Sequence, residues 1–105
     1  MVNSRRTGAN FERSIANILK EYGYETRRGQ QFSGLNGDAD VVGLPDVHIE
    51  CKAVENLNLY KAYEQSVRDA REGEKPIVIH KKNNKPILVT MDLPTFMEIY
   101  KGWRK

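Results

Sequence analysis

The sequence predicts an α/β fold in which helices flank a central mixed sheet, and three observations lead there. Apolar residues recur at helical spacing near the N-terminus, in the middle and near the C-terminus of the chain. Short segments of alternating or continuous apolar residues lie between those helices. The resulting order of elements, α-β-β-β-α-β-β-α, packs most economically as a sheet covered by helices.

Length and composition limit the kind of protein. A chain of 105 residues predicts one domain, residues 1–105. No apolar run is long enough to span a bilayer, and the first ten residues are too polar and basic for a secretory signal, so an intracellular, cytoplasmic location is expected. A single cysteine excludes an internal disulfide and gives no zinc cluster, and with only two histidines besides, no structural metal site is expected. The net charge of +3 permits nucleic-acid binding without requiring it.

The first helix should begin near Gly8 or Asn10 and end at Tyr22 or Gly23, since glycine is a natural helix stop. Its expected core stripe follows helical spacing and consists of Phe11, Ile15, Ile18, Leu19 and Tyr22. Glu12 lies on the flank of that stripe, where its carboxylate faces solvent or leans toward the sheet.

A hairpin is predicted next. Residues 24–28 form a first strand, and residues 29–37 form a polar loop. Residues 40–42 and 47–52 are then antiparallel strands joined by the turn 43–46. Along the second of these strands, Val47, Ile49 and Cys51 alternate with His48, Glu50 and Lys52, which predicts one apolar and one ionisable face.

The second half of the chain continues the pattern. A helix over residues 58–72, closed by Gly73, should turn inward Leu59, Ala62, Tyr63, Ser66, Val67 and Ala70. Strands 77–80 and 86–90 follow, and the loop between them carries Lys81, Lys82 and Lys85, as a solvated tip or a nucleic-acid contact. A last helix begins at Asp92, with Phe96, Met97 and Tyr100 inward. Tyr60, Tyr63 and Trp103 fit a core or an interface equally well.

The predicted hairpin brings Asp40 toward Glu50, and Glu50 shares a strand face with Lys52. Two carboxylates and an ammonium at one point suit a divalent cation, an activated water and an anionic substrate. A lone Glu-x-Lys usually means solvated charges, but the upstream aspartate, the apolar alternation and the hairpin spacing together favour a site.

Two other aspartates compete with Asp40. Asp38 is the weaker competitor. It lies two residues before Asp40, and only its position in the sequence distinguishes the two. Asp46 follows Pro45 in the turn and is too close to Glu50 along the chain to lie on an opposing strand.

This pattern resembles the PD-(D/E)xK nucleases, in which an aspartate and a short gap precede Glu-x-Lys on the next strand, within a restriction-endonuclease-like α-β-β-β-α-β core. The chain looks most like the small Holliday junction resolvases of archaeal and phage type. Ser4-Arg5-Arg6, Gly8, Glu12-Arg13 and the strand ending at Arg28 stand in the order found there. Ala39 before the aspartate, the shorter chain and the short tail after Trp103 depart from that pattern.

The resemblance implies roles for individual residues. Asp40, Glu50 and Lys52 would be catalytic; Glu12, Asp40, Glu50 and the Cys51 carbonyl would bind Mg²⁺, for which Mn²⁺ would substitute. Arg5, Arg6, Arg27 and Arg28 would contact DNA. Gln65 would either lie near the site, as a polar residue often does in such nucleases, or face solvent. His48 is expected to be a strand histidine rather than the base, and Cys51 a core residue rather than a nucleophile.

Three functions follow from this interpretation. The first is a homodimeric, metal-dependent endonuclease acting on branched DNA, in the host cytoplasm if a phage encodes it. The second is a nuclease of the same fold that cuts duplex or flap DNA, in restriction, repair or replication. The third is a non-catalytic DNA-binding module, which the intact Asp and Glu-x-Lys set disfavours.

Overall fold

The computed structural model describes residues 4–30 and 39–105 of the chain. These residues form three helices and five strands. In chain order they are α1 (Ser4–Glu21), β1 (Arg27–Arg28), β2 (Val41–Val42), β3 (Val47–Lys52), α2 (Leu59–Asp69), β4 (Lys75–His80), β5 (Leu88–Thr90) and α3 (Leu93–Trp103). None of the described helices combines the length and apolarity that crossing a membrane requires.

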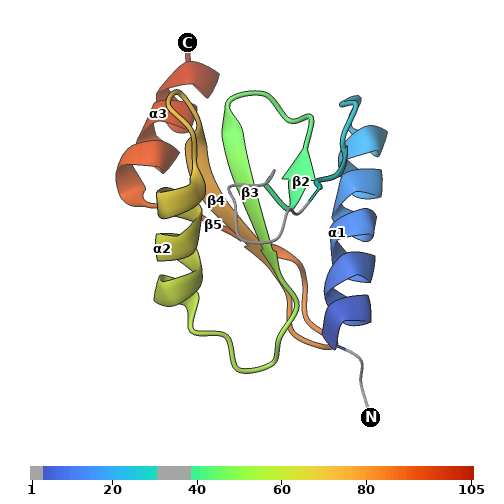
Figure 1. Cartoon of the computed structure of the whole chain (residues 1–105). Helices are drawn as coiled ribbons and strands as arrows, with labels where there is room; N and C mark the ends of the chain where they lie inside the picture. The colour runs from blue at the N-terminus through green and yellow to red at the C-terminus, as the bar shows by residue number, and fades with distance from the viewer. Residues whose placement is uncertain (1–3, 31–38) are drawn as a thin grey trace.

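The five strands form one mixed sheet in the order β1-β2-β3-β4-β5. The pair β3 and β4 is parallel, and the other neighbouring pairs are antiparallel. Helix α2 makes the crossover that a parallel pair requires. Figure 1 shows α1 on one side of the sheet and α2 and α3 on the other. The predicted α/β class, a mixed sheet flanked by helices, is confirmed.

The main core lies between α1 and the sheet. Its buried members are Phe11, Ile15, Ala16, Val41, Ile49, Cys51, Ile77 and Ile79. On the opposite face, α2 packs through Ala62 and Ser66, and the Ser66 hydroxyl donates a 3.0 Å hydrogen bond to the Ile77 carbonyl. Strand β3 is therefore covered on both faces, as expected for a strand in a parallel pair. This explains why His48 and Glu50, on its ionisable face, are only 4% and 5% exposed.

Two expectations for the N-terminal third are corrected. Helix α1 begins at Ser4 rather than at Gly8 or Asn10, so Arg5 and Arg6 belong to its first turn. An internal glycine costs a helix only about 1 kcal/mol, so Gly8 can lie within α1 without ending it. Tyr22, expected in the core, is 76% exposed because the helix ends at Glu21.

The short strands and α2 also differ from their expected bounds. Strand β1 is limited to Arg27–Arg28, and α2 ends at Asp69, three residues before the expected end. The backbone N–H of Arg71 donates to the Glu74 carboxylate at 2.8 Å, which closes a turn where the helix was expected to continue. Strand β4 begins at Lys75, because Lys75 N–H donates to the Asp46 carbonyl at 2.8 Å.

Helix α3 begins as expected and packs less than expected. Asp92 caps it by accepting a 2.9 Å hydrogen bond from Thr95 N–H. Phe96, Met97 and Tyr100, predicted to face inward, are 48%, 41% and 41% exposed. Val67 of α2, also predicted inward, is 50% exposed. Both errors concern the outer layer of helices, where amphipathic spacing does not reveal how much sheet each helix covers.

Candidate active site

The turn between β2 and β3 sets the geometry of the site. Gly43 has φ +106°, and a Cβ there would lie 2.2 Å from the Glu25 carbonyl oxygen, so the position requires glycine. Asp46 closes the turn at φ 65°. The Pro45-Asp46 pair therefore lies in the turn, as predicted, away from the strand that opposes Glu50.

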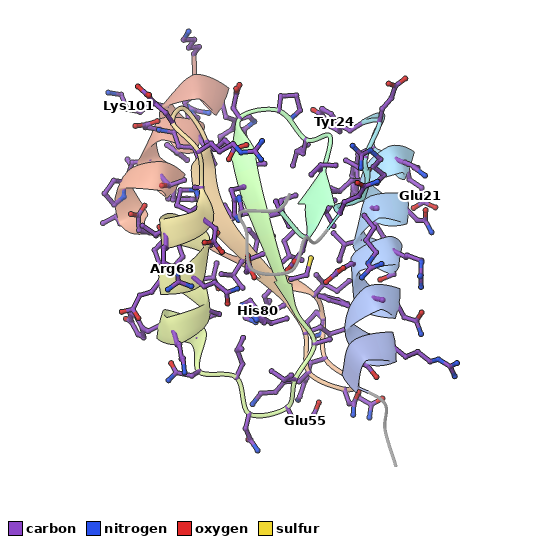
Figure 2. The ribbon with its side chains drawn as sticks, in the orientation of Figure 1. Glu21, Tyr24, Glu55, Arg68, His80 and Lys101 are labelled. Atoms are coloured by element: carbon purple, nitrogen blue, oxygen red, sulfur yellow. The ribbon has the colours of Figure 1, made fainter. Side chains whose placement is uncertain are left out.

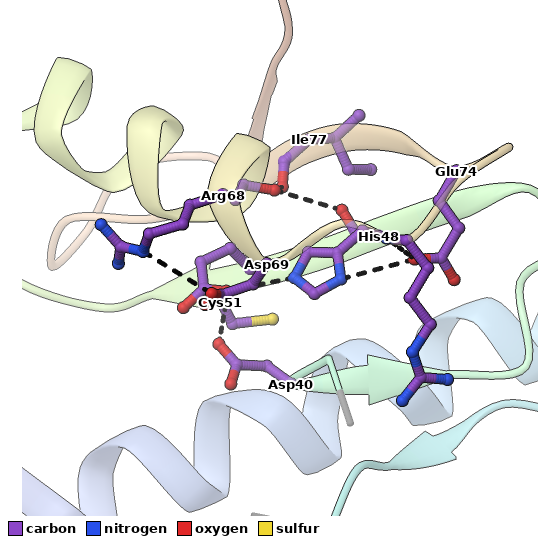
Figure 3. Close-up of polar contacts among 10 residues, drawn as sticks. Asp40, His48, Cys51, Arg68, Asp69, Glu74 and Ile77 are labelled. Carbon is purple, nitrogen blue, oxygen red and sulfur yellow. Dashed lines mark hydrogen bonds and ion pairs between the residues drawn. The ribbon is translucent and has the colours of Figure 1, made fainter. Parts of the chain in front are cut away.

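The hairpin register brings Asp40 next to β3. Val41 pairs with Ile49 in the antiparallel ladder, and Asp40 N–H donates to the Ile49 carbonyl at 3.0 Å. The Asp40 carboxylate in turn accepts a 2.8 Å hydrogen bond from Cys51 N–H, which Figure 3 shows. Asp40 is thus fixed beside the Glu50-Cys51-Lys52 segment by main-chain and side-chain contacts. The competing Asp38 lies outside the described residues, as does most of the predicted loop 29–37.

Electrostatics shows which charges surround Asp40. Burial, together with the negative charges of Glu50 and Glu12, raises its pKa from 3.8 to about 7, although Cys51 N–H and Lys52 oppose the rise. Charged groups from three segments therefore act on one another here: Glu12 of α1, Asp40 directly before β2, and Glu50 and Lys52 of β3. Negative charge prevails among them.

Glu12 leans toward the sheet rather than toward solvent. Its side chain is 13% exposed, and its Oε1 atom lies 2.7 Å from Nε of Arg28. The ion pair joins α1 to β1. Arg28, predicted to contact DNA, thus has a carboxylate partner within the chain. Arg6, Arg27 and Arg28 are all exposed. The side chain of Arg5 lies outside the described residues.

The donor set fits a hard divalent cation by its charge and chemistry. Glu12, Asp40 and Glu50 offer carboxylate oxygens, which Mg²⁺ prefers. The pKa of Asp40 is raised first by burial and then by the negative charges of Glu50 and Glu12, and a bound cation would stabilise the charged carboxylate. Among residues 4–30 and 39–105, no three His, Cys, Asp or Glu side chains are already drawn together around one point. Glu12, Asp40 and Glu50 therefore match a divalent cation in charge and ligand type, but their side chains are not already arranged around one point.

A buried histidine, His48, adjoins Glu50; its strand face was predictable from the alternation, but its partners were not. His48 Nε2 lies 3.5 Å from Glu50 Oε1, and its Nδ1 lies 3.8 Å from Glu74 Oε1. Burial alone would lower the pKa of His48, but Glu50, Glu74 and Asp69 raise it above its ordinary value. Figure 3 shows the ring between β3 and Glu74. The parallel register that pairs Val47 with Lys75 brings Glu74 here.

Cys51 has the environment of a core residue. Its side chain is 8% exposed, and burial together with the Asp40 charge raises the pKa of its thiol. A thiol held neutral in this way is a poor nucleophile. Gln65 is partly buried in α2, directly before Ser66, which bonds to β4.

Comparisons with known proteins agree with this arrangement. A family profile described as "Phage putative PDDEXK endonuclease" matches residues 3–105. The structure is similar to Hjc, a Holliday junction resolvase from the archaeal hyperthermophile Archaeoglobus fulgidus. The two are 25% identical with a TM-score of 0.60, over 81% of this chain and 72% of Hjc. No curated protein matches the chain in sequence.

The matched family is a family of nucleases. PD-(D/E)xK nucleases generally use divalent metals and act on nucleic-acid phosphodiesters. The fold is the restriction-endonuclease-like fold that Hjc also has. With a family match over nearly the whole chain and a resolvase of the same fold, the chain belongs to the PD-(D/E)xK nuclease superfamily, in the family of phage endonucleases.

Proposed function

We propose that the protein is a Mg²⁺-dependent endonuclease that resolves branched DNA, with Asp40, Glu50 and Lys52 as its catalytic residues. The observation that carries this proposal is the meeting of Asp40 with the Glu50-Cys51-Lys52 segment, fixed by the 2.8 Å hydrogen bond from Cys51 N–H. The structural similarity to a Holliday junction resolvase supports the choice of substrate.

Each residue has a distinct task in this mechanism. Glu12, Asp40 and Glu50 would hold the cation, with the Cys51 carbonyl as a further oxygen donor. The cation, when bound, supplies positive charge that makes water easier to deprotonate and stabilises charge on the phosphoryl oxygens. Lys52 orients the attacking water, and its ammonium stabilises the negative charge that develops on phosphorus.

A homodimer fits this substrate, because paired cuts in a junction require two active sites related by a two-fold axis. Exposed apolar side chains suited to such contact lie on β5, which is at one edge of the described sheet, and on α3. They are Leu88, Val89, Phe96, Tyr100 and Trp103, with exposures from 41% to 72%. The rings of Tyr100 and Trp103 meet edge to face at 5.6 Å. Large exposed apolar patches mark protein interfaces.

The dimer surface is tested by light scattering. Phe96→Glu should convert the dimer to a monomer, because it introduces a charge into the apolar contact. Val67→Glu is the matched control, since Val67 is similarly exposed, at 50%, but lies on α2. A monomeric wild-type protein, or a Phe96→Glu variant that remains a dimer, would refute this surface.

The activity is tested by comparing a four-way junction, a flap and a linear duplex of matched sequence, each with Mg²⁺ and with EDTA. We expect paired nicking of the junction with Mg²⁺ alone, since a branched substrate presents two phosphates without the cost of bending a duplex. Glu50→Ala should be inactive, whereas Asp46→Asn should retain most activity. Equal cutting of linear duplex by a monomer would instead indicate a restriction-like or repair nuclease, and binding without any cleavage would indicate a DNA-binding module.

A further inference from the structure

A basic turn lies next to the catalytic strand. Residues 82–85 close it by a 3.2 Å hydrogen bond from Lys85 N–H to the Lys82 carbonyl, and Asn84 adopts φ 61°, which asparagine tolerates. The side chains of Lys81, Lys82 and Lys85 are exposed. Three ammonium groups thus occur within five residues of the loop between β4 and β5.

Two hydrogen bonds tie this turn to the segment that carries the active site. Lys81 N–H donates to the carbonyl of Lys52 at 3.1 Å, where β3 ends. Asn83 N–H donates to the Glu55 carboxylate at 2.6 Å. Glu55 follows β3 by three residues, and Figure 2 shows it at the lower end of the molecule, below His80. The position of the turn is therefore fixed relative to Lys52.

The Glu55 carboxylate accepts a hydrogen bond from the backbone N–H of Asn83 and does not neutralise the lysines of the turn. Within the part of the chain that the structure describes, no ion pair joins Lys81, Lys82 or Lys85 to an acidic side chain. Lysine ammonium groups that lie beside a nuclease site are suited to phosphates, which they bind as point charges. A rigid turn also loses less conformational freedom on binding than a free loop.

We propose that the Lys81–Lys85 turn binds the DNA backbone on the flank of the scissile phosphate, and that Glu55 is the positioning residue that holds it there. The proposal rests on the function proposed above, since it takes DNA as the substrate. It adds a phosphate-binding surface to the arginines of α1 and β1, on the side of Lys52 where β3 ends.

Glu55 makes the proposal testable, because two interpretations of its role predict opposite changes in DNA affinity when Glu55 is replaced. If Glu55 only added negative charge near DNA, Glu55→Ala would strengthen binding. If it positions the turn, Glu55→Ala should weaken binding severalfold and lower the cleavage rate. Glu55→Gln should restore much of the affinity, because the amide oxygen can still accept from Asn83 N–H. Glu64→Ala is the matched control, an exposed acid on α2 whose loss should leave binding unchanged or slightly stronger.

The measurement is fluorescence anisotropy of a labelled four-way junction with Ca²⁺ in place of Mg²⁺, over a series of salt concentrations. Lys82→Ala with Lys85→Ala should lower affinity and reduce the slope of log K against log salt by roughly 0.9 per lost phosphate contact. An unchanged slope in this double variant, or tighter binding by Glu55→Ala, would overturn the proposal. Wild-type protein that bound no DNA would overturn the nuclease function as well, so the two failures are distinguishable.

Discussion

Replacing Asp40 by asparagine should stabilise the metal-free protein at pH 8 and abolish cleavage. Asp40 is held in a partly buried position near Glu50 and Glu12, where its negative charge is unfavourable. Asparagine has nearly the same shape, and its amide oxygen can still accept the hydrogen bond from Cys51 N–H. The substitution therefore removes the charge while it keeps the contact that orders the hairpin.

The magnitude follows from the pKa of Asp40, which is raised from 3.8 to about 7. At about 1.4 kcal/mol per pKa unit, the charged form would cost at most about 4 kcal/mol. Because Glu50 shares this repulsion and an amide is itself costly to bury, we expect a net gain of about 2 kcal/mol. In a domain of this size that corresponds to an increase in Tm of roughly 8 °C or more.

The raised pKa of Asp40 also determines how the stability of the folded protein changes with pH. Between about pH 4 and pH 7, folded Asp40 retains a proton that the unfolded chain releases. The stability of the wild-type protein should therefore fall as pH rises through this window, and that of Asp40→Asn should fall less. Below pH 4 the carboxyl is protonated in both states, and the penalty of its charge disappears.

The assay is urea unfolding in EDTA at several pH values from 5 to 8, followed by circular dichroism. Asp46→Asn is the control, because Asp46 lies exposed in the turn. Mg²⁺ should stabilise the wild-type protein at pH 8 and stabilise Asp40→Asn much less. If Asp40→Asn were no more stable than wild type at pH 8, or kept its full pH dependence, the reasoning from burial and charge would be refuted.

Substitutions at Lys52, His48 and Gly43 test other parts of the site. Lys52→Ala should lower kcat by roughly 100-fold or more with little change in DNA affinity, as measured by single-turnover cleavage and anisotropy, because its charge acts on the transition state. His48→Leu should weaken Mn²⁺ binding by about tenfold in calorimetry, and His48→Gln by less, because a donor beside Glu50 orients that carboxylate. Gly43→Ala should cost more than about 1 kcal/mol in urea unfolding, whereas Gly23→Ala, also at positive φ but in open space, should cost less.

The centre of the fold was predictable because its signals are local. The alternation along residues 47–52 defines the faces of β3, and the turn residues 43–46 define the hairpin. These two features together determine that Asp40 lies beside Glu50 and that Asp46 does not. A shift of one residue would turn Ile49 and Val41 away from the apolar core under α1, so the apolar residues enforce the register.

The parts that the sequence did not predict depend on contacts between distant segments. Glu74 meets His48 only because β3 and β4 pair in parallel, and the register of that pairing has no local signal. The ion pair of Glu12 with Arg28 likewise depends on how α1 crosses β1. The apolar spacing of α3 correctly predicted a helix, but Phe96 and Tyr100 remain exposed because spacing does not distinguish a core from an interface.

Glu50 lies between two groups of charges that act on it in opposite directions. Asp40 repels its carboxylate from the hairpin side, and His48 attracts it from the side of Glu74. Both neighbours are held by the backbone of the sheet, so Glu50 cannot relieve the repulsion by moving into solvent. A cation bound between Asp40 and Glu50 would turn that repulsion into shared attraction, while His48 continued to orient Glu50 from behind. The same buried charge that destabilises the metal-free protein would then supply part of its affinity for the metal.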